Sequence, residues 1–225
     1  MNDIIRRYTK PDPRIVEGFR TLGTATVYEA AGQTGNMDPE IKPAYPGARL
    51  CGTAVTVKCR VGDNLMLHKA VTVAGPGDVL VATIDNHLGV GAWGEILVTA
   101  AKVRGIVGLV IDGAVRDTEA YGKHGFPVFS RGVSVGSPSK KHGGTINHPI
   151  VCGNVVVEPG DIVIGDADGV VVVPKARARE VLDAALERER REAALMERLK
   201  AGATTLELLG LNAILESLGL TEEEE

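Results

Sequence analysis

The sequence predicts an α/β protein in which strands and helices alternate, with helices at the C-terminal end. Short apolar runs rich in β-branched residues predict the strands, helical spacing of apolar residues predicts the helices between them, and a charged amphipathic segment follows the last strand. A chain of 225 residues with 44% hydrophobic composition can bury a substantial core. We expect a compact α/β domain over residues 1–174, a helical extension over 175–221 and a disordered acidic tail over 222–225.

Helices are expected before the first strand. Asp12 and Pro13 fit an N-cap and a first helical position, and apolar residues at helical spacing continue to about Gly23. A second short helix is expected over residues 24–31. The first strand is expected over residues 51–59, where β-branched residues alternate with smaller ones as in a half-buried strand.

The middle of the chain alternates more clearly. Asp63 can cap a helix over residues 65–71, and a glycine-rich turn leads into an apolar strand over 79–83. A helix over 95–103 is followed by an apolar strand over 106–111. Ligands of open α/β sheets bind at the carboxyl ends of the strands, so we expect a ligand site directly after the strand over 106–111.

The C-terminal region indicates helices that pack on a surface beyond the sheet. A last strand over residues 170–173 is closed by Pro174. From about Lys175 the chain is helical, and a second helical segment is expected over 206–218. Apolar residues line one side of the first helix, namely Val181, Leu182, Ala185, Leu186, Ala193, Leu195 and Leu199. Because these helices lie past the last strand, we expect them at a subunit interface.

Composition excludes several classes of function. Lys and Arg total 25 against 29 for Asp and Glu, and this net charge of -4 offers no broad attraction for nucleic acid or anionic lipid. The N-terminus has no long apolar stretch of the secretion type, and no apolar run approaches the ~20 residues of a membrane span. We therefore expect a cytoplasmic protein that binds neither nucleic acid nor membranes.

Most catalytic motifs are missing from the sequence. It contains no nucleophile elbow, no H-E-x-x-H and no phosphate-binding glycine loop, and its five histidines lack paired metal-ligand spacing. Cys51, Cys59 and Cys152 lack C-x-x-C spacing and lie among strand-like residues, so we interpret them as buried, unpaired thiols.

One constellation is compatible with metal-assisted chemistry. Glu95 opens a helix, and Arg116 and Asp117 follow the adjacent strand, so the two segments are expected to be neighbours. The N–H groups of Glu95, Ile96 and Leu97 suit an anion such as a carboxylate, and Arg116 adds a planar charged fork. Asp117 and Glu95 supply oxygens that suit Mg²⁺ or Mn²⁺.

Structural roles for the same residues remain open from spacing alone. Asp117 could cap the helix that runs through Tyr121, Arg116 could only pair with Asp117, and Glu95 could favour the helix dipole.

Residues 95–129, centred on Gly-Leu-Val-Ile-Asp-Gly-Ala-Val-Arg-Asp, resemble the class II pyruvate aldolases that cleave 4-hydroxy-4-methyl-2-oxoglutarate and 4-carboxy-4-hydroxy-2-oxoadipate. The resemblance extends across nearly the whole chain, including residues 29–32, 52–57, 62–64 and 165–170. This family is related to the regulators of ribonuclease activity A. The resemblance implies an α/β sandwich with a swivelling-domain-like central sheet, assembled as trimers or hexamers.

The resemblance also assigns roles to residues. Asp117 is expected to ligate the divalent metal, Glu95 to hold metal-bound water, and Arg116 to bind the oxo acid and stabilise the enolate. Gly94, Ile96 and Leu97 join Glu95 and Arg116 in substrate binding. A carboxylate from a neighbouring subunit's C-terminal helix, Glu192 among Glu187, Glu189 and Glu192, is expected near the metal water. The aldolase version of this motif begins with Asp, so Glu95 is a departure from it.

The resemblance therefore implies a lyase that releases pyruvate, with oxaloacetate decarboxylation as a side activity. We expect 4-carboxy-4-hydroxy-2-oxoadipate to be preferred over the methyl analogue, because a basic loop could reach an additional carboxylate. That loop contains Lys140, Lys141, His142 and His148, and a purely solvated loop is an equal alternative.

Two rival functions remain. A Schiff-base aldolase would use an amine such as Lys58 or Lys102. A non-catalytic regulator would bind a ribonuclease, as the related proteins do.

Overall fold

The computed structural model describes residues 3–220, so the predicted acidic tail over 222–225 lies outside the described residues. Contacts divide the chain into two compact units, with the boundary between Ala185 and Leu186. This boundary falls inside helix α6 (Ala178–Lys200).

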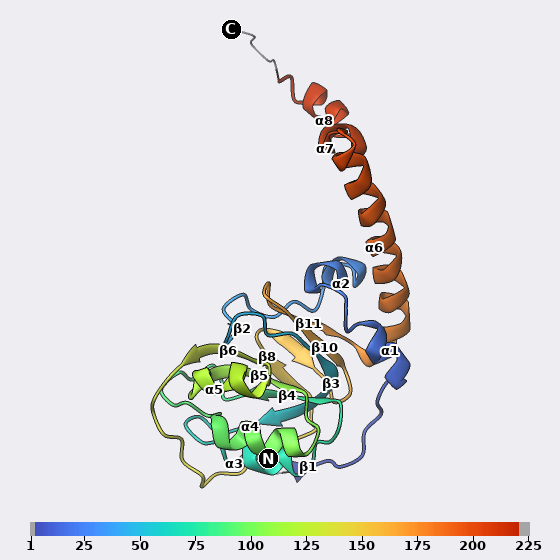
Figure 1. Cartoon of the computed structure of the whole chain (residues 1–225). Coiled ribbons are helices and arrows are strands. Elements are labelled where there is room, and N and C mark those ends of the chain that lie inside the picture. The colour runs from blue at the N-terminus through green and yellow to red at the C-terminus, as the bar shows by residue number, and fades with distance from the viewer. Residues whose placement is uncertain (1–2, 221–225) are drawn as a thin grey trace. The chain divides into compact units, whose positions relative to one another are not determined.

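Within its described residues, the first unit is built on a nine-stranded mixed sheet (Figure 1). The strands are β1 (Asp3–Ile4), β2 (Lys42–Pro43), β3 (Leu50–Lys58), β4 (Asp78–Thr83), β5 (Gly108–Val115), β6 (Val128–Val133), β7 (Thr145–Ile146), β10 (Ile162–Gly165) and β11 (Val170–Val173). β3, β4, β5 and β6 lie side by side in this order and are parallel to one another. Along one side of β3, the first half pairs with β10 and the end pairs with β7, both antiparallel.

Strand alternation directs side chains into two apolar cores, one on each face of the sheet. In β4, Leu80 and Ala82 enter the first core, which includes buried residues of α3 (Leu65–Val71), α4 (Glu95–Val103) and α5 (Thr118–His124). Val79 and Val81 enter the second core, which includes the hairpin β8 (Ile150–Cys152) and β9 (Val155–Val157). The half-buried pattern predicted for β3 is wrong, because both faces are covered and only Lys58 of this strand is exposed.

Several predicted elements agree with the structure. α3, α4 and β11 have the expected bounds, and α2 (Thr24–Ala30) is one residue shorter. Asp63 accepts a hydrogen bond from the backbone N–H of Leu65 at 2.8 Å, although it lies one position before the N-cap residue of α3.

Two predicted bounds are wrong. The first helix, α1 (Pro13–Gly18), ends well before Gly23. Its last residue packs so closely on Leu182 that a Cβ atom there would lie 2.7 Å from the leucine Cδ2. β5 begins two residues later and ends four residues later than expected, because residues around Gly91 pair with its carboxyl end.

The C-terminal helices carry many exposed apolar side chains. A 3₁₀ turn (Lys175–Arg177) leads into α6, whose first part is buried in the first unit through Ala178, Val181, Leu182 and Ala185. In the second unit, α7 (Thr205–Leu208) and α8 (Asn212–Ser217) follow. Their exposed apolar residues include Leu206, Leu209, Ile214 and Leu218.

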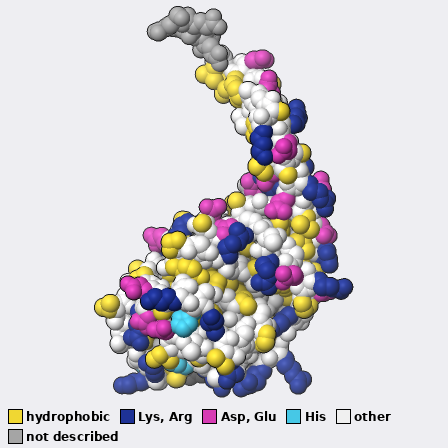
Figure 2. Space-filling model, viewed as in Figure 1, with side chains coloured by type: hydrophobic (Ala, Val, Ile, Leu, Met, Phe, Trp, Pro, Cys, Tyr) yellow, Lys and Arg dark blue, Asp and Glu magenta, His cyan; other side chains and the backbone are white. Residues whose placement is uncertain are grey.

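Surface charge is mixed in sign. Figure 2 shows positive and negative side chains interspersed over the visible face of the first unit and along α6. Across residues 3–220, every helix is too short or too polar to cross a bilayer.

Candidate functional site

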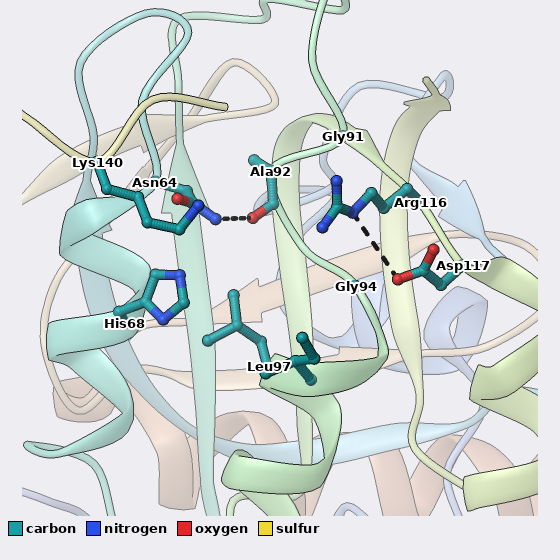
Figure 3. Close-up of a pocket in the computed structure, with 10 residues that line it drawn as sticks. Asn64, His68, Gly91, Ala92, Gly94, Leu97, Arg116, Asp117 and Lys140 are labelled. Carbon is teal, nitrogen blue, oxygen red and sulfur yellow. Dashed lines mark hydrogen bonds and ion pairs between the residues drawn. The ribbon is translucent and has the colours of Figure 1, made fainter. Parts of the chain in front are cut away.

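A small pocket lies beyond the carboxyl end of β5, between the beginnings of α3 and α4 (Figure 3). It is lined by Asn64, His68, Gly91, Ala92, Gly94, Ile96, Leu97, Arg116, Asp117 and Lys140. Figure 3 shows Arg116 and Asp117 on one side of the pocket and Asn64, His68 and Lys140 on the other. We define the Arg116 rim as Arg116 and Asp117 together with Glu95, which lies between the lining residues Gly94 and Ile96 in the chain, and the Lys140 rim as Asn64, His68 and Lys140.

Backbone hydrogen bonds bring the two predicted segments of the Arg116 rim together. The N–H of Ala92 donates to the carbonyl of Ala114 at 2.9 Å, and the N–H of Arg116 donates to the carbonyl of Trp93 at 2.8 Å. The extended residues before α4 therefore run beside the end of β5. This confirms that Glu95 and the Arg116-Asp117 pair are neighbours, although 20 residues separate Glu95 from Arg116.

Gly94 makes this close approach possible. A Cβ atom at this position would lie 2.4 Å from Oδ2 of Asp117 and 3.2 Å from Cγ of Arg116. Any side chain here would push the carboxylate and the guanidinium away from the start of α4. The absence of a side chain at Gly94 therefore lets Arg116 and Asp117 lie against the start of α4.

Asp117 has an unusual backbone conformation at the start of α5. Its φ of 56° and ψ of 37° lie in the left-handed region, and its side chain makes no hydrogen bond to its own helix. Instead, Oδ2 accepts a hydrogen bond from the N–H of Glu95 at 3.1 Å. The interpretation of Asp117 as a simple cap of its own helix is therefore wrong, because the carboxylate faces the beginning of α4.

Among the described residues, Arg116 makes only long side-chain contacts. Its Nε lies 3.8 Å from Oδ2 of Asp117, and its Nη1 donates to the hydroxyl of Ser137 at 3.5 Å. Both distances exceed those of strong charge-assisted bonds, so the guanidinium retains donors for a ligand.

The N–H groups at the start of α4 are only partly available. The N–H of Glu95 donates a hydrogen bond to the Asp117 carboxylate. The N–H of Leu97 donates to the carbonyl of Gly94 at 3.0 Å. Among the residues 3–220, we find no hydrogen-bond partner for the N–H of Ile96. The expectation of three free N–H groups is therefore wrong for two of them.

The side chain of Glu95 contacts a residue that the sequence reasoning missed. Its Oε1 lies 2.9 Å from Nε2 of His124, at the end of α5. Tyr121, on the same helix, donates from its hydroxyl to the carbonyl of Arg116. Asp117, Tyr121 and His124 follow one another at spacings of four and three residues, and this helical spacing could have placed them on one face.

The Lys140 rim combines a buried amide with two basic groups. Asn64 donates from Nδ2 to the carbonyl of Ala92 at 2.8 Å, whereas its buried Oδ1 has no hydrogen-bond partner among the described residues. Burial, together with the nearby charge of Lys140, lowers the pKa of His68 below its ordinary value. His68 therefore favours its neutral form beside a positive Lys140. The sequence reasoning assigned no ligand role to Asn64 or His68.

Asp63 anchors the loop that carries Lys140. Its Oδ2 accepts hydrogen bonds from the hydroxyl of Ser139 at 2.5 Å and from the backbone N–H of Lys141 at 2.7 Å. Burial alone would raise the pKa of Asp63, but these hydrogen bonds hold it well below its ordinary value. The aspartate thus remains charged and fixes the loop.

The four basic residues predicted to meet the substrate are not all brought together. Lys140 lines the pocket. His142 contacts Asp63 at 3.2 Å, and His148 contacts an aspartate of β1 at 3.0 Å. Lys141 also lies outside the set of residues lining the pocket. A shared role for all four is therefore wrong.

The donor groups limit the kind of metal that the pocket could hold. Within residues 3–220, no three His, Cys, Asp or Glu side chains are grouped as ligands. Asp117 has a half-exposed carboxylate at the pocket, beside Glu95. This set fits a hard cation that keeps most of its ligands as water and substrate oxygens, and does not fit an ion held wholly by one chain.

Other predicted residues lie elsewhere. Lys58 pairs with Asp85 at 3.5 Å, and Lys102 donates to the carbonyl of His124, so neither lysine lines the pocket among the described residues. Glu192 lies in the second unit, where its carboxylate pairs with Arg188 of the same helix at 2.8 Å. Its approach to a neighbouring site stays a prediction.

The cysteines are buried and unpaired, as predicted. Burial raises the pKa of Cys51 to about 11 and that of Cys59 to about 12. It also raises the pKa of Cys152 far above its ordinary value. All three thiols are therefore protonated near neutral pH and make poor nucleophiles.

A family model and a similar protein of known sequence both point to one family. Residues 24–172 match the family model RraA-like, described as Aldolase/RraA. A Halalkalibacterium halodurans protein named "Putative 4-hydroxy-4-methyl-2-oxoglutarate aldolase" is 39% identical over 171 residues, which cover 76% of this chain and 81% of that protein.

Solved structures share the fold. An uncharacterized protein from Pseudomonas syringae pv. tomato has a TM-score of 0.79 and 30% identity, covering 88% of this chain and 97% of its own. Streptomyces coelicolor RraAS2, described as an unusual member of the RNase ES inhibitor RraA protein family, has a TM-score of 0.75 and 27% identity. That match covers 84% of this chain and 100% of the other.

Proposed function

We propose that this chain, which belongs to the RraA-like family (Aldolase/RraA), is a divalent-metal-dependent lyase that cleaves a 4-hydroxy-2-oxo acid into pyruvate and a second oxo acid. The observation that carries the proposal is the Arg116 rim. The Arg116 guanidinium, the Asp117 carboxylate and the backbone N–H of Glu95 meet there at the carboxyl end of a parallel strand, beside a pocket.

The reaction needs a place for the electrons of the breaking C3–C4 bond. They move onto the C2 carbonyl oxygen and form an enolate, while C4 becomes a carbonyl carbon. Arg116 binds the C1 carboxylate and places positive charge beside the developing enolate oxygen. Its weak contacts within the chain support this role, because the guanidinium donors can turn to the ligand.

The C4 hydroxyl must lose its proton in the same reaction. Glu95 holds the water that accepts this proton, and protonation of the enolate at C3 then gives pyruvate. The exposed carboxylate of Glu95 and its contact with His124 at 2.9 Å support a fixed position for that water.

Mg²⁺ or Mn²⁺, when bound, would supply Lewis acidity to the substrate carboxylate and carbonyl oxygens. Asp117 would hold the ion directly, and Glu95 would contact it through water. The half-exposed Asp117 carboxylate and the sparse protein donors support a cation that keeps several waters. The same enolate arises from oxaloacetate by loss of carbon dioxide, so decarboxylation is a proposed side activity.

Lys140 provides the distal contact that distinguishes substrates. Its ammonium group and the neighbouring His68 lie across the pocket from Arg116 and suit an additional carboxylate (Figure 3). We therefore propose 4-carboxy-4-hydroxy-2-oxoadipate as the preferred substrate and 4-hydroxy-4-methyl-2-oxoglutarate as a second one.

Assembly into a trimer or hexamer is part of the proposal. The exposed apolar residues of α7 and α8 favour a protein partner over solvent. A second copy of this chain would cover them and bring Glu192 toward the metal water of its neighbour. A fully active monomer in light scattering would contradict this part.

A ribonuclease-binding regulator is the second candidate, favoured by the fold shared with Streptomyces coelicolor RraAS2. The test compares two measurements on the same preparation. We expect pyruvate release from both hydroxy-oxo acids, with a higher kcat/KM for the carboxy compound, and no inhibition of a ribonuclease E-type enzyme. Absence of cleavage together with ribonuclease inhibition would reject the aldolase in favour of the regulator.

A further inference from the structure

One face of α5 is directed at the segment that begins α4. Asp117 accepts the N–H of Glu95 at 3.1 Å, and His124 contacts the Glu95 carboxylate at 2.9 Å. Between them along the helix lies Tyr121, whose hydroxyl is 2.5 Å from the carbonyl oxygen of Arg116 and 3.1 Å from that of Trp93. These two carbonyls immediately precede Asp117 and Gly94 in the chain.

The Tyr121 hydroxyl stays protonated and donates a hydrogen bond. Its side chain is fully buried, and burial together with the charge of Asp117 raises the pKa of the phenol far above its ordinary value. Among residues 3–220, we find no other hydrogen-bond donor to the carbonyl of Arg116. Loss of this hydroxyl would leave that carbonyl without its protein partner.

The next residue, Asp117, needs such support. Its left-handed backbone is unfavourable for a residue other than glycine and persists only where the surroundings hold it. An aspartate at a helix start ordinarily turns its carboxylate onto its own helix. That competing conformation would withdraw the carboxylate from Glu95 and from the pocket.

We propose that Tyr121 is a positioning residue of this site. By holding the main chain of Arg116 beside that of Trp93, its hydroxyl keeps the Asp117 carboxylate turned to α4 and the Arg116 guanidinium turned to the pocket. The expected effect on turnover rests on the proposed lyase function, whereas the expected effect on the Asp117–Glu95 contact does not.

The test variant is Tyr121→Phe, which removes the hydroxyl and keeps the buried ring. Tyr45→Phe is the matched control, because Tyr45 is partly buried and its ring lies near Gly122 of the same helix. Three quantities are compared with the unaltered protein: hydrogen exchange of the Glu95 amide, Mn²⁺ affinity by electron paramagnetic resonance, and kcat and KM for pyruvate release.

We expect Tyr121→Phe to accelerate exchange of the Glu95 amide, since its acceptor is released. Mn²⁺ affinity should fall about tenfold, the scale of losing a residue that orients a ligand. The kcat should fall about tenfold or more, because small displacements of catalytic groups cost large factors in rate. Tyr45→Phe should leave all three unchanged.

A Tyr121→Phe protein with lowered thermal stability but unaltered amide exchange, Mn²⁺ affinity and kcat would overturn the proposal, since it would show a structural role only. If the unaltered protein releases no pyruvate, the lyase proposal fails. Exchange of the Glu95 amide then decides the role of Tyr121, with acceleration supporting it and no change rejecting it.

Discussion

The two rims of the pocket are held in different ways. The Arg116 rim is fixed by main-chain hydrogen bonds between the end of β5 and the residues before α4, and by the space at Gly94. The Lys140 rim is held partly by a side chain: the buried carboxylate of Asp63 binds a distant loop to the start of α3, together with main-chain hydrogen bonds between Ser139 and residues 62 and 64. The first arrangement suits chemistry, which needs exact placement, and the second suits recognition of the variable end of a substrate.

Among the variants that test this contrast, removing the charge of Asp117 should have the largest effect on activity. Asp117→Asn tolerates the left-handed backbone and keeps an oxygen for the N–H of Glu95, but it loses the anionic ligand. We expect metal-dependent pyruvate release to disappear in a steady-state assay. Glu119→Gln, an exposed charge change on the same helix, is the control. Near-normal turnover by Asp117→Asn would place the metal elsewhere.

Arg116→Ala should have the next largest effect. We expect kcat/KM to fall roughly 10²-fold or more, the scale of deleting one preorganised donor to a developing oxyanion. Arg104→Ala, which removes an exposed arginine at the end of α4, should retain normal kinetics. Equal kinetics in the two variants would show that the guanidinium does not meet the substrate.

Lys140→Ala should weaken binding and leave the chemistry intact. We expect KM for 4-carboxy-4-hydroxy-2-oxoadipate to rise about tenfold with little change in kcat, as for the loss of one charge-assisted contact. Lys141→Ala is the matched control, since this neighbour does not line the pocket. If kcat falls and KM is unchanged, Lys140 belongs with the chemical groups, and the distinction between the rims is wrong.

The sequence predicted the Arg116 rim better than the Lys140 rim for a physical reason. Glu95, Arg116 and Asp117 lie at the ends of strongly patterned elements that are adjacent in the fold, so element bounds nearly place them. Asn64 and Lys140 meet because Asp63 and the main chain beside it bond a loop more than seventy residues away, and local periodicity carries no signal for that contact.

The orientation of individual side chains also could not be predicted from the sequence. Position alone made Asp117 a plausible cap of α5, and its left-handed conformation reversed that interpretation. The C-terminal helices were predictable from their amphipathic pattern, whereas the subunit interface expected for them stays a prediction.

The smallest effect should come from Asp63→Asn. The charged carboxylate of Asp63 accepts several hydrogen bonds, so its loss should lower the free energy of unfolding by about 2 kcal/mol at neutral pH. The pKa of Asp63 is held below its ordinary value in the folded state, so its contribution is present above that ordinary value and is lost as pH falls below it.

Urea unfolding of the Asp63→Asn protein and the unaltered protein at several pH values would measure this difference. Asp85→Asn, an exposed carboxylate change, is the control. A difference in stability that stays constant from neutral to strongly acidic pH would contradict the charged anchor.

The most direct test of the central claim is pyruvate release from oxaloacetate by protein stripped of metal with EDTA. We predict no release above the uncatalysed rate, recovery on addition of Mg²⁺ or Mn²⁺, and no covalent adduct after borohydride treatment with substrate. Full activity in EDTA, or trapping of the substrate on a lysine by borohydride, would contradict the assignment of enolate stabilisation to Arg116 and a cation held by Asp117.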